Sequence, residues 1–467
     1  MAKKELRVFL PFRPPVDPLF LKSMAEYDCS LLLYRTWLNY DFSRKATPGI
    51  VKSWAYNEKS GIYLLTLDPQ KWSDGSTITS HHLAQNLERV FKSKTTFGKA
   101  LAKIIDRKSI ATPSPETLSF KTVDGRPSES LFNQLGSIFL ALIHPDDLDK
   151  TKTRLVGNTK SSGPYVIDSE TDKVVTFKKN PHFKSENPDS PDVIVANIQD
   201  QKVNLIDFLK GKTWSNYYQT NSFVSAELGR AIRDSGLPIW TRGADRVMLM
   251  RPLGKGEKLK RNQHITQILG SLIKTAKINH PLDVKIAKSL QPNGYPLFGD
   301  IEFDSVKPTK EKTKISILTM AEASTKVAED LVNELAAKAG IDVEWRAIPS
   351  TDFLTRDWES FGADYALFSF GVADPEPTTW LGLVFGSKLI QYSPTEKKKY
   401  EKIAGISDQG EQVAQYRDLL RSIAMRGGYL PLMHGATISI GAKGMSFERV
   451  DPLDETVDYS KIRMNVQ

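Results

Sequence analysis

The second half of the chain alternates between the two periods of apolar residues that strands and helices produce. Val327, Leu331, Leu335 and Ala339 recur every four positions and Gly340 supplies a stop, which predicts a helix over 324–339. The flanking segments predict a strand over 314–319, a strand over 341–347, a short helical piece over 350–360 and an apolar strand over 364–370. This alternation predicts a mainly parallel sheet covered by helices.

Other segments extend this interpretation to the rest of the chain. Helical periods run over 262–276 and 412–426, and a further helix contains Leu83 and Phe91. The first half carries short strand-like runs at 62–67, 118–122 and 174–178, separated by prolines and glycines. The predicted fold class is therefore α/β, with α+β character in the first half.

Composition excludes several classes of protein. The 467 residues suggest two to three domains, and 40% hydrophobic and 25% charged residues are ordinary for a globular chain. The net charge of +9 is spread along the chain rather than gathered on one element with aromatics, so a nucleic-acid binder is not indicated. Cys29 is the only cysteine; it can form no intrachain disulfide, and we expect it to be buried.

Catalytic motifs do not appear. The sequence holds no Walker-type phosphate loop, no G-x-S-x-G elbow and no H-E-x-x-H zinc motif. His81 and His82 are adjacent, so on a helix their rings point about 100° apart and do not form a joint metal site. His434 follows an apolar strand, where it could line a cleft or fill a structural role. We therefore expect no enzyme, metal or cofactor.

Six segments, in their order and spacing, carry a family resemblance. They are Leu6-Arg7-Val8 with Val16-Asp17-Pro18, PGIVKSWAYNEKSGIYLLTLDPQKWSDGSTITSHHLAQNLERVF (48–91), SSGPYVI (161–167) with the following Asn180-Pro181-His182-Phe183, KLKRNQHITQIL (258–269), FSFGVADPEPTTWL (368–381) and GGYLPLMHGATISI (427–440). Together they resemble the family 5 extracellular solute-binding proteins, the oligopeptide, dipeptide and nickel-binding group that serves ABC importers. The resemblance covers nearly the whole chain. We interpret the Trp72-Ser73-Asp74-Gly75 segment as a structural turn above a packed tryptophan.

The sequence departs from the family pattern in three places. The helix after this turn starts Thr79-Ser80-His81-His82, and His82 stands where the family has a carboxylate. Reciprocal capping is therefore predicted to be lost. The Ala-Asp-Tyr-x-x-Pro stretch is shortened at 373–377. Dipeptide-binding members carry an arginine near the end of the 314–320 strand for the ligand carboxylate, and residues 318–322 hold none. The resemblance therefore does not imply a ligand of fixed dipeptide length, and the residue that binds a ligand carboxylate stays open.

The resemblance implies a two-lobed periplasmic-binding-protein-like fold with an extra N-terminal subdomain and a hinged cleft. We place lobe I at 1–33, 159–238 and 438–467, the additional subdomain at 34–158 and lobe II at 239–437. Hinge closure about crossings near 236–242 and 434–440 would clamp a ligand between the lobes.

Asp374 is the predicted partner of a ligand ammonium. It follows the strand 364–370 at its carboxyl end, where open α/β sheets bind ligands, and the resemblance places it at the family's amine-binding aspartate. It could instead be a turn residue before Pro375, and Glu376 is the rival anion. The other candidate ligand contacts are Trp380, Phe370, Tyr165 and His434, each with a core role as the alternative.

The predicted function is a substrate-binding receptor of an ABC importer, which binds peptides and delivers them to a membrane permease. The alternatives are a receptor for another small solute, such as a nickel chelate or an oligosaccharide, and a periplasmic sensor or interaction module. The predicted location is periplasmic or extracellular. The apolar run after Met1-Ala2-Lys3-Lys4 is broken by Arg7, Pro11 and Arg13 and cannot be a signal core, so a cytoplasmic protein and a removed signal both fit the residues.

Overall fold

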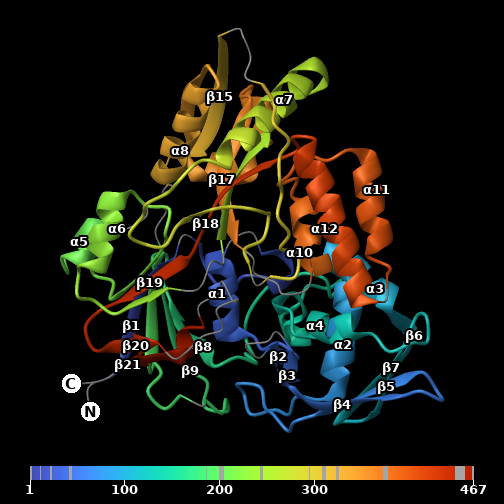
Figure 1. The fold of residues 1–467 in the computed structure, drawn as a ribbon. Helices are drawn as coiled ribbons and strands as arrows, with labels where there is room; N and C mark the ends of the chain where they lie inside the picture. The colour runs from blue at the N-terminus through green and yellow to red at the C-terminus, as the bar shows by residue number, and fades with distance from the viewer. Residues whose placement is uncertain are drawn as a thin grey trace. The chain divides into compact units, whose positions relative to one another are not determined.

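The computed structural model divides the chain into two compact units. Unit 1 comprises residues 1–218 and 440–467, and unit 2 comprises 219–439. The described residues are 3–10, 12–21, 24–40, 45–185, 187–198, 204–241, 246–293, 295–307, 312–321, 325–371, 377–406, 408–447 and 458–464. Figure 1 labels the elements of both units. The finer three-part division remains a prediction.

Unit 1 contains two four-stranded sheets and two small ribbons. In the first sheet, of order β1-β10-β9-β8, β1 pairs with β10 in parallel, and the other two pairings are antiparallel. The second sheet is antiparallel, of order β4-β5-β7-β6. The strands of unit 1 are β1 (Glu5–Leu10), β2 (Leu38–Tyr40), β3 (Ala46–Pro48), β4 (Val51–Asn57), β5 (Ile62–Leu67), β6 (Ile105–Ser114), β7 (Thr117–Thr122), β8 (Tyr165–Glu170), β9 (Val174–Lys179), β10 (Val193–Ile198), β20 (Met445–Phe447) and β21 (Ile462–Met464).

The predicted first-half elements are confirmed as β5, β7 and β9 and as the helix α2 (Ser80–Lys92). Leu83, Leu87 and Val90 of α2 are fully buried, as the helical spacing required. The remaining helices of unit 1 are α1 (Met24–Leu33), α3 (Thr96–Ile104), α4 (Glu129–Leu135) and α5 (Leu205–Leu209), with 3₁₀ turns η1 (Pro18–Phe20), η2 (Ile138–Leu140), η3 (Pro145–Asp147) and η5 (Tyr459–Lys461). Cys29 lies in α1 and is buried, as expected, and burial raises the pKa of its thiol.

Unit 2 is built on a six-stranded sheet of order β14-β18-β13-β17-β15-β16. Its strands are β13 (Arg246–Pro252), β14 (Lys285–Ile286), β15 (Thr313–Met320), β16 (Ile341–Ile348), β17 (Tyr365–Gly371) and β18 (Leu430–Gly435). A separate sheet of order β11-β19-β12 joins β11 (Tyr217–Asn221), β12 (Ile239–Thr241) and β19 (Thr437–Gly441), and both points at which the chain changes units fall in it.

The predicted strands in β15, β16 and β17 are confirmed, but the prediction of a mainly parallel sheet is wrong. Strand β15 pairs in parallel with β16 and with β17, whereas the three pairings that join β17, β13, β18 and β14 are antiparallel. The helix α8 (Lys326–Lys338) makes the parallel crossover between β15 and β16. Strand β13 enters from a distant part of the chain, so no local period reveals its direction.

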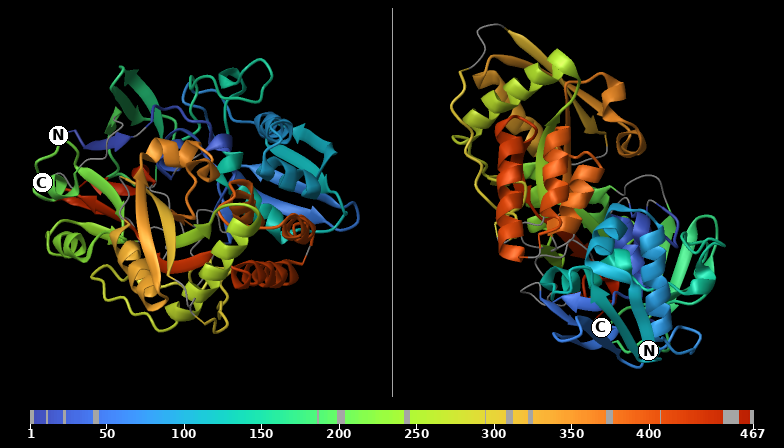
Figure 2. Two further views of the ribbon diagram at one scale, coloured as in Figure 1. Left: turned by 90° about the horizontal axis from the view of Figure 1, so that it is seen from above. Right: turned by 90° about the vertical axis from the view of Figure 1, so that its right-hand side faces the viewer.

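Helices of unit 2 follow the predicted periods. The predicted helices appear as α7 (Gly256–Ile273), α8 and α12 (Gln409–Met425), and the short piece is divided into α9 (Ser350–Thr355) and η4 (Trp358–Phe361). Helices α7 and α8 contact each other and the sheet. Helix α11 (Pro394–Ile403) runs beside α12 (Figures 1 and 2). The others are α6 (Ala226–Arg233) and α10 (Pro377–Gly386).

Candidate functional site

One edge of the six-stranded sheet collects the carboxyl ends of four strands. Strands β15, β16 and β17 are parallel, and β18 runs in the same direction because it is antiparallel to β13, which is antiparallel to β17. The four strands end here at Met320, Ile348, Gly371 and Gly435, and β13 begins here at Arg246. We call this the carboxyl edge of unit 2. Open α/β sheets bind ligands at such an edge.

Two predicted site residues, Phe370 and Trp380, meet at the carboxyl edge. Phe370 lies at the end of β17 and Trp380 in α10, and their rings stack with centroids 5.7 Å apart. The Trp380 indole is 1% exposed, and its Nε1–H donates to the carbonyl of Gly371 at 3.3 Å. Phe370 is half-buried. Trp380 is therefore bonded to the end of β17, and Phe370 is the ring of the pair that retains exposed surface.

Asp374 and Glu376 lie outside the described residues. The described chain leaves β17 at Gly371 and resumes at Pro377, the first residue of α10. Both flanking residues belong to elements that meet at the Phe370–Trp380 stack. The role of either acid in binding a ligand stays a prediction.

His434 is a buried neutral histidine near the end of β18. Its Nε2 lies 3.0 Å from the carbonyl of Ser289, to which it donates. Burial lowers its pKa to about 4, although the bond to Ser289 opposes this shift. The ring is 7% exposed, so the structure gives it a partner within unit 2, and a ligand contact for it stays a prediction.

Tyr165 belongs to unit 1, at the start of β8. Its hydroxyl donates to the carbonyl of Pro191 at 2.7 Å, and its side chain is 1% exposed. Burial raises the pKa of this hydroxyl. Like the polar atoms of Trp380 and His434, its hydroxyl is already bonded to a backbone carbonyl, and its role in binding remains a prediction.

Arg246 is a residue of the carboxyl edge that the sequence analysis did not single out. It is half-buried and stands opposite Gly371 on β17 and Gly435 on β18. Its Nη2 donates to the hydroxyl of Ser369 at 3.3 Å. Nothing in its immediate sequence marks it, because its position follows from the antiparallel entry of β13 between two distant strands.

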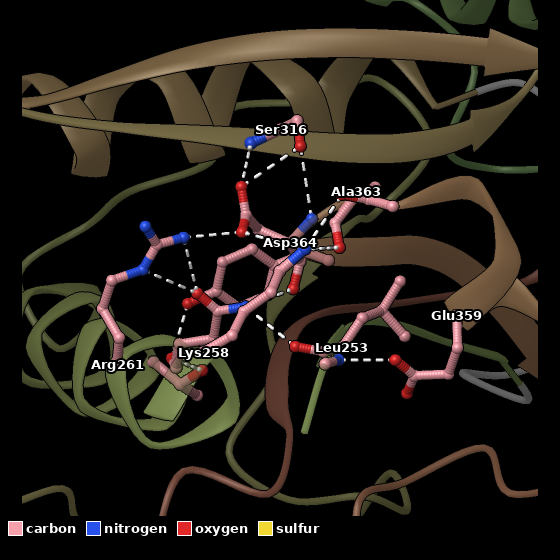
Figure 3. Close-up of polar contacts among 12 residues, drawn as sticks. Leu253, Lys258, Arg261, Ser316, Glu359, Ala363 and Asp364 are labelled. Atoms are coloured by element: carbon pink, nitrogen blue, oxygen red, sulfur yellow. Dashed lines mark hydrogen bonds and ion pairs between the residues drawn. The ribbon is translucent and has the colours of Figure 1, made fainter. Parts of the chain in front are cut away.

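The opposite edge of the same sheet is fixed by a polar network around Asp364 (Figure 3). One carboxylate oxygen of Asp364 accepts from Arg261 at 2.6 Å, and the other accepts from the backbone N–H and hydroxyl of Ser316 at 2.9 and 3.1 Å. Asn262 of α7 donates to the carbonyls of Leu253 and Asp364 at 2.8 and 3.0 Å. These bonds tie α7 to β13, β15 and β17, so this edge is a structural anchor.

A second polar cluster lies in unit 1, around the Trp-Ser-Asp-Gly turn. Asp74 accepts from the backbone N–H of Ser76 at 2.9 Å and from its hydroxyl, which lowers the Asp74 pKa to about 2. Gly75 adopts φ 86°, and Trp72 is fully buried. The predicted structural role of this turn is confirmed.

The predicted loss of reciprocal capping at α2 is wrong, because His82 replaces the missing carboxylate. The Thr79 backbone N–H donates to Nδ1 of His82 at 3.0 Å, which completes a capping box. Burial is the main cause that lowers the His82 pKa to about 4, and the neighbouring His144 adds to it. The ring is therefore neutral near pH 7 and keeps a lone pair on Nδ1 for the bond.

Two absences hold for the part of the chain that the structure describes. No group of three or more His, Cys, Asp and Glu is placed to hold a metal ion there. Among the described helices, none has the length and apolarity that crossing a bilayer requires.

Solved structures with the same fold are solute-binding proteins. NikA from Brucella suis, in complex with Fe(III)-EDTA, has a TM-score of 0.77 at 14% identity, over 98% of this chain and 99% of that one. The murein tripeptide binding protein MppA from Escherichia coli has a TM-score of 0.76 at 16% identity, over 100% and 99%. OppA from Haemophilus influenzae, in complex with RPPGFSPFR, has a TM-score of 0.75 at 12% identity, over 100% of both chains.

These similarities define the class of fold as that of the two-lobed periplasmic binding proteins. Residues 45–241 match the model of the bacterial extracellular solute-binding proteins, family 5 middle, which confirms the resemblance seen in the motifs. The chain therefore resembles the family 5 solute-binding proteins. A search of curated protein sequences finds no match.

Proposed function

We propose that this protein is the substrate-binding receptor of an ABC-type importer and that it binds peptides. The match of residues 45–241 to the family 5 solute-binding proteins supports a receptor for a small solute that works with an ABC permease. The observation that carries the proposal at the level of residues is the Phe370–Trp380 stack at the carboxyl edge of unit 2. It stands at the end of the strand that leads into Asp374.

The chemistry of the edge suits a zwitterionic solute. The proposed anion, Asp374, would hold the ammonium of the solute by a charge-assisted hydrogen bond. The half-buried Phe370 offers an apolar surface, and strand ends offer backbone groups that pair with an extended peptide without regard to its side chains. Clamping between hinged lobes, as the resemblance implies, completes the proposed cycle.

The similar structures leave the solute class broader than peptides. NikA is in complex with Fe(III)-EDTA, MppA is a murein tripeptide binding protein, and OppA is in complex with the peptide RPPGFSPFR. A chelated metal is therefore the second candidate solute. The proposed location is the periplasm or the outer face of a bacterial membrane, and the proposed role is non-enzymatic.

Thermal unfolding with a pool of short peptides tests the proposal. A peptide present at 100 times its Kd adds about 2.7 kcal/mol to the free energy of unfolding. Asp374→Asn should lose this stabilisation, while Asp342→Asn, at an exposed position of β16, should keep it. No stabilisation by any peptide or chelate would favour an interaction or sensor module. An unchanged response in Asp374→Asn would remove the assignment of the ammonium site.

A further inference from the structure

Two histidines of unit 1, His82 and His144, cap neighbouring turns of the chain through the same ring nitrogen. Nδ1 of His82 accepts the backbone N–H of Thr79 at 3.0 Å, at the start of α2. Nδ1 of His144 accepts the backbone N–H of Asp146 at 3.1 Å, at the start of η3. Each bond needs a lone pair on Nδ1, which an imidazole keeps only while it is neutral. A proton on Nδ1 turns the acceptor into a donor that faces another donor, so acid removes both caps.

The two rings contact each other and Trp72 of the Trp-Ser-Asp-Gly turn. The Trp72 ring stands edge-on to both, with its centroid 5.4 Å from that of His82 and 4.8 Å from that of His144, and the imidazole centroids are 5.7 Å apart. Trp72 is fully buried, His144 is 7% exposed and His82 is half-buried. A charged imidazole is poorly solvated in such a cluster and is favoured when it moves out into water.

The charged groups around the pair offer a second arrangement to the protonated form. Nζ of Lys160 lies 3.5 Å from Nε2 of His144. It pairs with Asp146 at 3.2 Å and with Asp74 of the turn at 3.4 Å. Lys160 opposes a charge on either ring, whereas Asp146, whose Oδ2 is 3.5 Å from Nδ1 of His144, would accept a hydrogen bond from the protonated ring. Other titratable groups that face the two rings are His81, Asp147 and Asp74.

We propose that His82 and His144 form a pH switch in unit 1, which holds the Trp72 turn closed while both rings are neutral and opens it when they take up protons. The first proton removes one cap and separates the rings. The second imidazole then loses its packing partner and gains solvent, so it binds its own proton more readily than before. Burial lowers the pKa of both rings, so the switch operates below the ordinary histidine value of about 6.5. It does not depend on which solute the protein binds.

Two substitutions separate the caps from their protons. His82→Gln supplies a glutamine oxygen, the usual acceptor at this position of a capping box. His144→Asn supplies an asparagine oxygen, which is favoured at an N-cap. Both variants keep an acceptor for the backbone N–H but have no group there that titrates near pH 5. His81→Gln, which alters the exposed neighbouring histidine and leaves both caps in place, is the control.

Hydrogen–deuterium exchange of the full chain, measured by mass spectrometry, tests the pH switch. Peptides that cover 70–83 and 143–150 are followed at pH 7.0, 5.5 and 4.5, and each exchange rate is compared with that of the unfolded chain at the same pH. In wild type, the protection of both segments should fall together by about tenfold or more between pH 7.0 and 4.5, because pH 4.5 lies about two units below the ordinary histidine pKa. The double variant His82→Gln/His144→Asn should keep its pH 7.0 protection at pH 4.5, and His81→Gln should behave as wild type.

Three outcomes would overturn the pH switch. They are wild type that stays protected at pH 4.5, a double variant that opens as wild type does, and a loss of protection that spreads over the whole chain at once. The second would assign the response to the carboxyl groups, and the third to general acid unfolding. Where the double variant is less protected already at pH 7.0, the single variants carry the test. The logarithm of protection should change with pH by more than one proton in wild type and by no more than one in either single variant, and equal slopes would overturn the pairing.

Discussion

The capping of α2 by a neutral histidine has a pH dependence that can be worked out from the structure. His82 accepts the Thr79 backbone N–H at 3.0 Å, and its ring stands edge-on to Trp72 with centroids 5.4 Å apart. Replacing it by alanine removes the acceptor and the ring contact. Loss of a capping interaction costs about 0.5–2 kcal/mol. At pH 7.5 we therefore expect His82→Ala to lower the free energy of unfolding by about 1–2 kcal/mol.

The sign of the pH effect follows from the His82 pKa, which is about 4 when folded against an ordinary 6.5. The unfolded chain binds the proton more readily, so the stability that the neutral ring contributes is present above pH 6.5 and is lost as the pH falls toward 4. The pKa difference corresponds to at most about 3.4 kcal/mol, and screening of a half-buried ring by solvent reduces this to about 1–2 kcal/mol.

Several charged groups face the ring and set this value. His144 lies with its ring centroid 5.7 Å away, and the Nζ of Lys160 is 3.5 Å from Nε2 of His144. His144, His81 and Lys160 all disfavour a positive charge on His82, while Asp146 favours it. Because His144 also has a lowered pKa, only the difference between wild type and variant isolates His82.

The assay is urea unfolding of wild type, His82→Ala and His81→Ala at pH 7.5, 5.5 and 4.5. The destabilisation of His82→Ala should shrink from about 1–2 kcal/mol at pH 7.5 to near zero at pH 4.5, because the wild type loses its advantage. His81 is the matched control for the cap: it is adjacent and exposed, and at pH 7.5 its substitution should have little effect on stability because it leaves the bond from Thr79 to His82 in place. A His82→Ala deficit that is constant or grows toward pH 4.5 would refute the neutral cap.

Two further predictions concern the packing of unit 2. Asp364→Asn should lower the free energy of unfolding by about 2–4 kcal/mol in urea titrations, because it weakens the bonds to Arg261 and Ser316. Ordinary surface substitutions change this free energy by up to about 0.5 kcal/mol, so a change below that size would contradict the role of Asp364 as an anchor. Gly427→Ala should abolish or severely reduce thermal stability, because at φ 79° the added Cβ would lie 2.2 Å from the backbone oxygen of Gln263. Gly340 has a similar φ of 72° but lies in open space, so Gly340→Ala should lower the free energy of unfolding by only about 1 kcal/mol. Equal effects of the two substitutions would contradict the packing argument.

Local periods predicted the elements of unit 2 that form consecutive crossovers. Strands β15, β16 and β17 and helix α8 follow one another along the chain, and each buries one face or a whole strand, so their apolar spacing is visible. Strand β13 was not predicted. Its run from Arg246 to Pro252 is short, and its antiparallel place between β17 and β18 depends on residues more than a hundred positions away.

The same limit explains which site features the sequence revealed. Asp374 was predicted from an apolar strand and a family motif, and its role stays a prediction because it lies outside the described residues. Arg246 could not be predicted, because two glycines from other strands define its surroundings. The cap by His82 was missed because a histidine replaces a carboxylate only when it is neutral, and its neutrality depends on burial and on His144 from a distant segment.

The central claim is that this chain binds a small solute as its function. Native mass spectrometry of freshly purified protein, compared with the same protein after unfolding and refolding in clean buffer, tests it most directly. We predict that a mixture of pentapeptides with free carboxyl termini, added to the refolded protein, restores one bound peptide per chain. The added mass should equal that of a peptide in the mixture. A refolded protein that binds no peptide or chelate at concentrations up to about 1 mM would contradict the claim. A Kd of that size corresponds to a binding free energy of about −4 kcal/mol.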